Sequence, residues 1–323
     1  MSAIIIAQKE ALQPALNALA RGDVVAIPTE TVYGLAGDAT NGAAIARIFE
    51  AKRRPRFNPL IAHVADIAMA ERLVVFDKVS RELAMQFWPG PLTLVLPLRS
   101  DAGVHPLATA GLETLAVRMP RGFAHELITA FGKPLAAPSA NSSGRISATT
   151  AAHVADDLGG RIPLIIDGGP TSVGLESTIV KVERGALHLL RPGGLSAEAI
   201  TSATGLPLIR DSSHGIQAPG MMASHYAPRA AMRLDATSIR PDEAWLGFGP
   251  APAPAGAVAS LNLSPAGDPV EAAANLFAYM QMLDRSGAKA IAAAPIPQTG
   301  LGEAINDRLA RAAARRDDAF PTG

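Results

Sequence analysis

The sequence predicts an α/β protein with one large domain built on a mixed sheet and a smaller α/β domain after it. Short apolar runs alternate with helix-like stretches up to residue 208, the order typical of an α/β or α+β domain. Several of these runs end at Pro or Gly, which indicates sharp turns out of a sheet. A polar segment without periodicity then precedes a second, shorter series of the same kind.

In the large domain, strands and helices are expected to alternate along the chain. A short apolar run bounded by turn residues is typical of a buried strand, whereas the helical stretches are longer. The expected strands are VVAIP (24–28), PLIAHV (59–64), LTLVLPL (92–98), TLAVRMP (114–120), PLAAPSA (134–140), PLIIDGG (163–169) and STIVKV (177–182). The expected helices are EALQPALNALARG (10–22), GAAIARIFEAKR (42–53), SRELAMQFW (80–88), AHELITAFG (124–132) and TTAAHVADDLGG (149–160).

The polar segment contains Gly and Pro and is typical of a linker between domains. It also contains HYAP, with His225 and Tyr226, which a spacer alone would not need. Beyond it, strands are expected at 244–249, 257–263 and 290–296, and helices at 269–287 and 303–316. We therefore predict a large domain at 1–208, a linker at 209–230 and a C-terminal domain at 231–323.

The composition bounds the possible functions. With 323 residues, 48% hydrophobic and 18% charged, the chain can bury a sizeable core. Its formal net charge is zero at pH 7, which argues against binding nucleic acid through a field of the whole protein. It has no cysteine, so disulfides, thiolate metal ligands and a thiol nucleophile are excluded. The N-terminus shows no signal-peptide pattern and no apolar run spans a bilayer, so we expect a cytoplasmic chain without membrane contact.

Polar side chains repeatedly follow the ends of the expected strands. The stretches are PTETVYGLAGDAT (28–40), APSANSSGRISATT (137–150), DGGPTSVGLESTIVKV (167–182) and LLRPGGLS (189–196). Each alone is explained by turns and helix caps. Their recurrence favours one cavity rimmed by strand ends, able to hold an anion with hydroxyls and backbone N–H groups. A serine hydrolase is disfavoured because no G-x-S-x-G elbow occurs, and the usual nucleotide and zinc signatures are also absent.

A cluster of basic residues precedes the strand that contains His63. Lys52, Arg53, Arg54 and Arg56 lie at the expected end of a helix, where cations interact favourably with the helix dipole. The Arg-Pro and Asn-Pro steps force an extended path, which would hold these side chains at a cleft where Arg and Lys suit phosphate. A lone histidine in an apolar strand is usually a core residue, and the sequence does not give its direction.

Taken together, PTETVYGL, AKRRPRFNPLIAHV, WPGPLTLVL, VRMP, APSANSSG, ESTIV and LRPGG resemble the YrdC-like family of L-threonylcarbamoyladenylate synthases. The resemblance covers about residues 10–208, and APGMMASHYAP with the domain after it resembles the long, two-domain form. It implies a twisted mixed sheet around a concave, positive cavity, and a smaller Rossmann-like C-terminal domain. It also implies a nucleotidyltransferase that converts ATP, L-threonine and bicarbonate or CO₂ into threonylcarbamoyl-AMP and pyrophosphate.

The resemblance also implies roles for individual residues. ATP or its adenylate would be contacted by Lys52, Arg54, Asn58, Thr114, Asn141, Thr149, Arg191 and the linker residue Tyr226, which would close over the nucleotide. Threonine would be held by Thr31, His63, Arg118, Ser139 and Ser177. Lys52 and Arg54 would be catalytic, no protein metal site is expected, and Mg²⁺ would come with ATP. Ser147 is the alternative to Thr149, and the additional charges of Arg53 and Arg56 would be solvated.

Partners follow from the same resemblance. The product would pass to a tRNA threonylcarbamoyl transferase complex that modifies position 37 of tRNAs reading codons that begin with A, so tRNA would be bound only indirectly or weakly.

One alternative function is that of an RNA-binding module. The zero net charge and the 4% aromatic content argue against it. Another is one module of a larger carbamoyl-transfer enzyme, whose zinc-finger segments would need the cysteines that this chain lacks.

Overall fold

The computed structural model describes residues 2–210, 218–221 and 224–314. The chain forms two compact units, one made of 1–143 and 148–221 and the other of 144–147 and 222–323. Part of the predicted linker, residues 211–217 and 222–223, lies outside the described residues. The domain boundaries predicted from the sequence therefore stay predictions.

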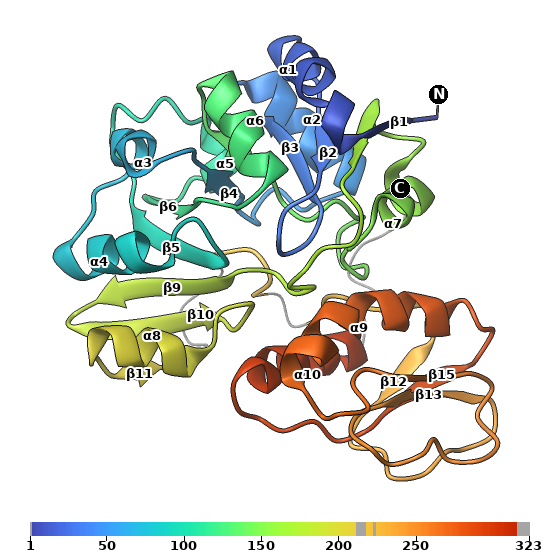
Figure 1. The fold of residues 1–323 in the computed structure, drawn as a ribbon. Coiled ribbons are helices and arrows are strands. Elements are labelled where there is room, and N and C mark those ends of the chain that lie inside the picture. Colours follow the sequence, from blue (N-terminus) through green and yellow to red (C-terminus); the bar gives the residue numbers. More distant parts are fainter. Residues whose placement is uncertain (1, 211–217, 222–223, 315–323) are drawn as a thin grey trace. The chain divides into compact units, whose positions relative to one another are not determined.

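The first unit is built on an 11-stranded mixed sheet (Figure 1). Its strands lie in the order β1-β8-β2-β3-β7-β4-β6-β5-β9-β10-β11. The strands are β1 (Ile4–Ala7), β2 (Val25–Ile27), β3 (Gly34–Asp38), β4 (Ile61–His63), β5 (Leu92–Pro97), β6 (Thr114–Arg118), β7 (Leu135–Ala136), β8 (Leu164–Asp167), β9 (Thr178–Glu183), β10 (Ala186–Arg191) and β11 (Leu208–Ile209). The mixed sheet predicted from the sequence is thus confirmed.

The helices of this unit begin where the sequence supplies a capping side chain. Asn41 caps α2, Asp77 caps α4, Thr150 caps α7 and Ser196 caps α8, each accepting a backbone N–H of the first turn. The α-helices are α1 (Leu12–Ala20), α2 (Gly42–Lys52), α3 (Ile67–Leu73), α4 (Lys78–Phe87), α5 (Pro106–Thr109), α6 (Phe123–Phe131), α7 (Ala151–Leu158) and α8 (Ala197–Thr204). A short 3-10 helix, Gln8–Glu10, precedes α1.

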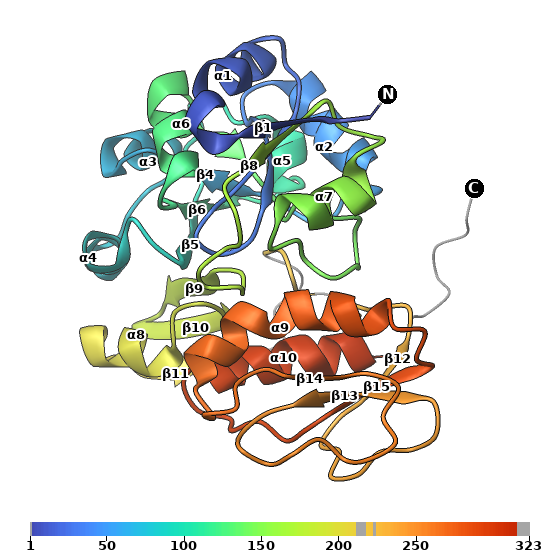
Figure 2. The same cartoon turned by 45° about the vertical axis from the view of Figure 1, so that its right-hand side comes forward.

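Successive side chains of the strands enter two different cores, because side chains alternate between the faces of a sheet. Val25 and Ile27 pack in the core under α1, α3, α4, α6 and α8, whereas Ala26 packs in the core under α2, α5 and α7. Figure 2 shows the same helices from a second direction. The unit therefore has an α/β/α arrangement around β2, β3 and β8.

In the part of the sheet formed by β4, β6, β5 and β9, the two faces are covered differently. One face packs into the large core, while the other carries the small cluster Ile61, Val95, Ala116, Ile179, Leu190 and Ala218. Ala218 and the partly buried Met221 are loop residues, and no described helix contributes to this cluster. This part of the sheet thus leaves one face for polar side chains, and we call it the open face.

The second unit contains a parallel four-stranded sheet in the order β12-β15-β13-β14. Its strands are β12 (Ala231–Arg233), β13 (Glu243–Gly247), β14 (Ser260–Asn262) and β15 (Ala290–Ala293). Its helices α9 (Pro269–Asp284) and α10 (Leu301–Ala313) lie side by side on this sheet (Figures 1 and 2). The buried residues Leu276, Phe277 and Met280 of α9 supply much of its core.

Several elements are not visible in the sequence pattern. β3 is the stretch GLAGD, whose glycines and alanine give no apolar run, and β10 follows β9 after a tight turn at Arg184 and Gly185. The short helices α3, α5 and α8 were also not predicted, because they span only 7, 4 and 8 residues. Short elements carry little periodicity, so tertiary packing decides them.

Candidate functional site

Polar side chains gather on the open face of the sheet. Alternation along β4 and β6 places His63 and Arg118 on the same face as the cluster residues Ile61 and Ala116. The two are direct cross-strand neighbours in the parallel register of β4 and β6. Thr93 of β5 lies on this face for the same reason, two residues before Val95. These side chains are buried, so each needs a partner in the protein or in a ligand.

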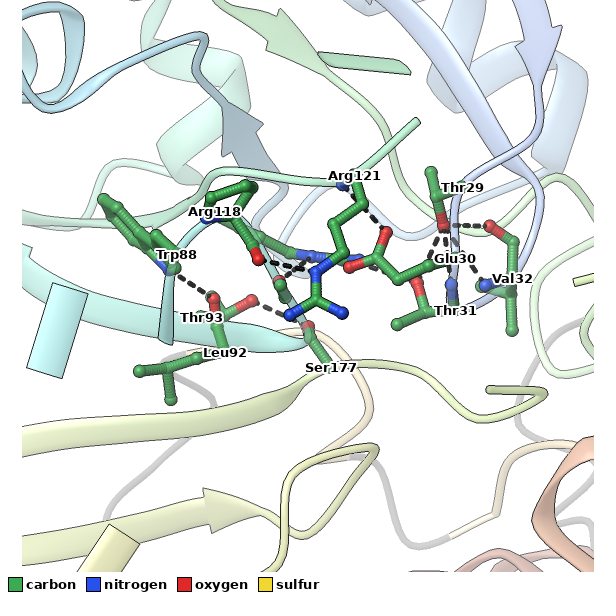
Figure 3. A network of polar contacts seen from close by, with 12 residues as sticks. Thr29, Glu30, Thr31, Val32, Trp88, Leu92, Thr93, Arg118, Arg121 and Ser177 are labelled. Carbon is green, nitrogen blue, oxygen red and sulfur yellow. Dashed lines mark hydrogen bonds and ion pairs between the residues drawn. The ribbon is translucent and has the colours of Figure 1, made fainter. Parts of the chain in front are cut away.

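Arg118 is the centre of a buried network (Figure 3). Its Nη2 forms an ion pair with Oε1 of Glu30 at 2.7 Å, and Nη1 donates to Oγ1 of Thr31 at 2.9 Å. Its Nε donates to the carbonyl of Gly90 at 3.1 Å. Both side chains of the ion pair are almost fully buried, with 4% of Arg118 and 8% of Glu30 exposed. Thr31 and Arg118, which are both predicted to bind the substrate threonine, are thus in direct contact.

His63 is held in its neutral form. Burial, and next the positive charge of Arg118, lower the pKa of His63 from 6.5 to about 3. Its Nδ1 is buried and has no hydrogen-bond partner among the described residues. A satisfied core histidine, the ordinary explanation for such a residue, would have its ring nitrogens paired. Hydrogen bonding to the backbone of Ile61 and Leu135 acts on the pKa in the opposite direction, and Nδ1, unpartnered within the part of the chain that the structure describes, is the ring atom that suits a ligand on the open face.

Ser177 lies between two strands of the site. Its Oγ forms a hydrogen bond with Oγ1 of Thr93 at 2.7 Å, and Nη2 of Arg191 donates to the same oxygen at 3.2 Å. Nε and Nη2 of Arg191 also donate to the Ser177 carbonyl. The close approach depends on Gly193, where an added Cβ would lie 2.3 Å from the carbonyl oxygen of Glu176. Arg191, which is predicted to bind ATP, therefore contacts Ser177, which is predicted to bind the substrate threonine.

Lys52 is placed differently from an exposed phosphate ligand. It is the last residue of α2 and is 1% exposed. Its Nζ donates to the carbonyl oxygens of Ser139 and Asn141, each at 2.5 Å. Burial, and next the positive charge of Arg54, lower the pKa of Lys52 well below its usual value. Lys52 thus ties α2 to the loop that carries two other predicted site residues.

Arg54 holds the chain on the way to β4. Its Nε donates to the carbonyl of Asn58 at 3.1 Å and its Nη2 to that of Pro59 at 2.7 Å. By contrast, Arg53 and Arg56 are exposed, in agreement with solvated charges. The Arg-Pro and Asn-Pro steps therefore order one arginine of the basic run, Arg54, beside Lys52.

The residues around Arg118 and those around Lys52 meet near the start of β3. The loop from Thr29 to Tyr33 leads into β3, and Gly34 forms a bridge with Ser139. The negative charge of Glu176, next to Ser177, acts on the pKa of Lys52. Tyr33 closes the other side, since its hydroxyl donates to the carbonyl of Gly169 at 2.7 Å, and burial raises the pKa of Tyr33 to about 12.

Three residues that are predicted to bind ATP lie apart from these contacts. Thr114 is half-buried at the start of β6, on the same face as Arg118 and at the other end of the strand. Thr149 is buried, and its Oγ1 lies 3.3 Å from Nδ1 of His153. Tyr226 belongs to the second unit, where its ring stacks on Phe277 with centroids 5.5 Å apart. Contact of these three with a nucleotide stays a prediction.

Some residues of the site were missed in the sequence. Glu30 and Thr93 make the ion pair and the hydrogen bond described above, and Thr171 has a buried hydroxyl without a partner among the described residues. The backbone N–H of Thr171 donates to the carbonyl of Thr149. Glu30 stood in the quoted stretch PTETVYGL, but nothing in the sequence gives its partner 88 residues away. Thr93 is one polar residue inside an apolar run, which was a usable signal.

Within 2–210, 218–221 and 224–314, no group of three or more His, Cys, Asp or Glu side chains is placed to hold a metal ion. In the same ranges, no helix has both the length and the apolar character needed to cross a membrane.

Known proteins resemble the whole chain. Residues 17–193 match the model of the family described as "Telomere recombination", and residues 195–314 match that described as "Threonylcarbamoyl-AMP synthase, C-terminal domain". Proteins named threonylcarbamoyl-AMP synthase are 41% identical over 92% of this chain and 91% of the relative in Bacillus subtilis, and 42% identical over 91% and 92% in Pyrococcus abyssi. The crystal structure of P. abyssi Sua5 complexed with L-threonine covers 96% of this chain and 97% of its own, with 38% identity and a TM-score of 0.87.

Proposed function

Because the chain belongs to the YrdC-like family of threonylcarbamoyl-AMP synthases in its two-domain form, we propose that it is an L-threonylcarbamoyladenylate synthase. The observation that carries the proposal is the buried group of Arg118, Thr31, His63 and Ser177 on the open face of the sheet. It offers a guanidinium for a carboxylate together with neutral hydrogen-bonding groups for an amine and a hydroxyl.

L-Threonine would occupy the open face. Arg118 suits its carboxylate, because guanidinium N–H groups match the two oxygens of a carboxylate. Neutral His63 and the hydroxyls of Thr31, Ser139 and Ser177 are suited to its amine and hydroxyl. A site built to hydrogen-bond a substrate hydroxyl rejects an analogue without it by roughly 10⁴-fold. This would separate threonine from valine.

ATP would lie beside the threonine, toward the basic residues. Arg54 and Arg191 would neutralise phosphate charge, and Lys52 would add a further charge while holding the loop at Ser139 and Asn141. The other proposed nucleotide contacts are Asn58, Thr114, Asn141, Thr149 and Tyr226. Mg²⁺ is proposed as part of the ATP substrate, where it offsets phosphate charge.

The reaction needs no protein nucleophile. The neutral amine of threonine attacks CO₂ with loss of a proton, or bicarbonate with loss of water, and forms a carbamate. A carbamate oxygen then attacks the α-phosphorus of ATP, and the bond to pyrophosphate breaks. Transfers of this type depend on alignment and on neutralisation of charge, which Lys52, Arg54 and Arg191 would supply. Carbamates decompose in water, so closure of the linker at Tyr226 would protect the intermediate.

The finer biological context is part of the same proposal. The bicarbonate substrate, the transferase complex that receives the product, and a cytoplasmic location are inferred from the family and from the chemistry of the product. The predicted linker at 209–230 and the C-terminal domain at 231–323 would gate the site.

Isotope labelling tests the proposed reaction directly. The purified full chain is incubated with ATP, Mg²⁺, L-threonine and ¹³C-bicarbonate, and the nucleotide products are analysed by mass spectrometry. We expect an adenylate of threonine whose mass includes the labelled carbon. An unlabelled threonyl-adenylate would instead mean ordinary aminoacyl adenylation and would refute the proposal.

A further inference from the structure

Glu30 is a carboxylate in the site whose purpose the proposed chemistry does not explain. It lies between Thr29 and Thr31, beside residues proposed to bind threonine, yet its charge is opposite to that of an anion-binding site. Its Oε1 contacts Nη2 of Arg118 at 2.7 Å and its Oε2 accepts the backbone N–H of Arg121 at 3.1 Å. Both carboxylate oxygens are therefore engaged by protein groups.

The loop of Glu30 is held in place independently of its side chain. The carbonyl of Glu30 accepts the N–H of Val173 at 2.8 Å. Oγ1 of Thr29 donates to the carbonyl of Val32 at 2.7 Å, which closes the turn between them. A fixed loop presents the carboxylate to Arg118 in one geometry, so the guanidinium has little freedom to rotate (Figure 3).

The same contacts fix the direction of the hydroxyl hydrogens. A hydroxyl carries one hydrogen, and Thr29 uses its own for the carbonyl of Val32. With that hydrogen on the Val32 carbonyl, Thr31 is the donor in the 2.8 Å contact between the two threonine hydroxyls; the backbone N–H groups of Thr31 and Val32 approach the same Thr29 oxygen at 3.1 and 3.3 Å. Thr31 also accepts from Nη1 of Arg118 at 2.9 Å. Its oxygen keeps one lone pair and no hydrogen for a ligand, so Thr31 can only accept from a substrate N–H or O–H.

Arg118 is left with a defined set of free donors. A guanidinium has five N–H groups. The described residues engage three of them through Gly90, Thr31 and Glu30. One N–H remains on each terminal nitrogen, so two donors are left for a ligand carboxylate. Rotation of the guanidinium would lose both this pair of donors and the acceptor state of Thr31.

We propose that Glu30 is a positioning residue for substrate recognition: it fixes the guanidinium of Arg118 so that Arg118 receives the threonine carboxylate and Thr31 accepts from the threonine amine or hydroxyl. The inference rests on the proposed function only in taking threonine as the ligand of this face. It predicts that Glu30 acts on threonine through Arg118 and has no direct effect on ATP.

The test measures L-threonine binding and turnover separately in the full chain. The variants are Glu30→Gln, Glu30→Asp and the matched control Asp38→Asn, which removes another buried carboxylate that is paired with Lys133 at 3.1 Å. Calorimetry gives the Kd for threonine alone, and pyrophosphate release gives KM for threonine and for ATP. We expect Glu30→Gln to raise the Kd and KM for threonine on the order of tenfold or more, because it removes the charged partner that fixes the guanidinium of Arg118. Glu30→Asp keeps the charge and should recover part of this loss, while KM for ATP stays unchanged.

A double-mutant cycle separates positioning from a general loss of stability. In the Arg118→Lys background, Glu30→Gln should cause much less than its tenfold effect on threonine binding. The inference would be overturned if the effects of the two substitutions were fully additive, or if Asp38→Asn had an equal effect. It would also be overturned if Glu30→Gln left the Kd unchanged, or if the wild-type protein bound no threonine. If threonine binding follows the prediction but no adenylate forms, the inference stands and the proposed function fails.

Discussion

At the residue scale, the charge state of His63 is the property that burial changes most clearly. The pKa of His63 falls from 6.5 to about 3 in the folded protein because the ring is buried beside Arg118. Between these two pH values, only the unfolded chain takes up the proton. The folded state therefore loses stability as the pH falls from 6.5 toward 3, by about 1.4 kcal/mol for each pH unit.

The His63→Gln variant tests this dependence. Between pH 7.5 and pH 5, the wild type should lose about 2 kcal/mol more of its free energy of unfolding than the variant, because only the wild type carries the shifted imidazole. Urea unfolding at the two pH values measures the difference. Equal losses in the two proteins would show that the imidazole is not held neutral in the folded state.

Lys52 gives a second prediction at this scale. Lys52→Met removes both hydrogen bonds to Ser139 and Asn141 and leaves one buried and one partly buried carbonyl without this donor. We expect a loss of roughly 1–3 kcal/mol in the free energy of unfolding, and weaker ATP binding because the loop is no longer tied to α2. Lys78→Met, at an exposed lysine whose ion-pair partner Glu82 is exposed as well, is the control and should change stability little. Full ATP affinity in Lys52→Met would contradict this role.

Single site residues could be predicted from the sequence only where they belong to a motif of residues adjacent in the chain. Thr31, Arg118 and Ser177 were predicted through the resemblance. In the structure all three are buried; Arg118 contacts Thr31, and Ser177 contacts Thr93 and Arg191, while their contact with threonine stays a prediction. The ion pair between Glu30 and Arg118 could not be predicted. It joins side chains 88 residues apart, and only the folded sheet brings them together.

At the element scale, the sheet itself positions the chemistry. The register of β4 with β6 pairs His63 with Arg118, and the register of β5 with β9 pairs Leu92 with Thr178, so Thr93 and Ser177 can meet. A shift of either register by one residue would turn these side chains to the other face. The apolar strands were predictable, because alternating packing on two cores makes them continuous apolar runs. β3 was not, because glycines and a charged residue replace the apolar pattern.

The turn after β10 gives the sharpest prediction for an element. In Gly193→Ala, the added Cβ would lie 2.3 Å from the Glu176 carbonyl oxygen and 2.6 Å from that of Ser177. The backbone must shift, so we expect a loss of roughly 1–3 kcal/mol in stability and weaker threonine binding. Gly160→Ala is the matched control, since its Cβ meets nothing within 4 Å. Thermal unfolding and threonine calorimetry check both, and equal behaviour of the two variants would refute the close approach.

At the scale of the whole molecule, the two units are not continuous in the sequence, which the sequence alone did not indicate. The short segment 144–147 belongs to the second unit, where the N–H of Ala227 donates to the carbonyl of Gly144 and Gln281 donates to that of Ser147. This segment lies in the chain between Asn141 and Thr149, which are both proposed to contact ATP. Loss of the second unit should therefore disturb the ATP residues through their own backbone.

Deletion of residues 209–323 tests this proposal. We expect lower turnover and a raised KM for ATP, because the 144–147 segment loses its packing partners and Tyr226 is removed. Circular dichroism and threonine calorimetry show whether the remaining chain is folded. Unchanged steady-state turnover in a folded, truncated protein would show that the second unit and the linker do not gate the site.

Pyrophosphate release from ATP shows whether the chain adenylates a threonine carbamate. Release is followed with the purified full chain and Mg²⁺, and L-threonine and bicarbonate are each omitted in turn. We expect release only when both are present. Release without bicarbonate would mean that threonine itself is adenylated, and no release from folded protein would favour an RNA-binding module; either result would refute the proposed function.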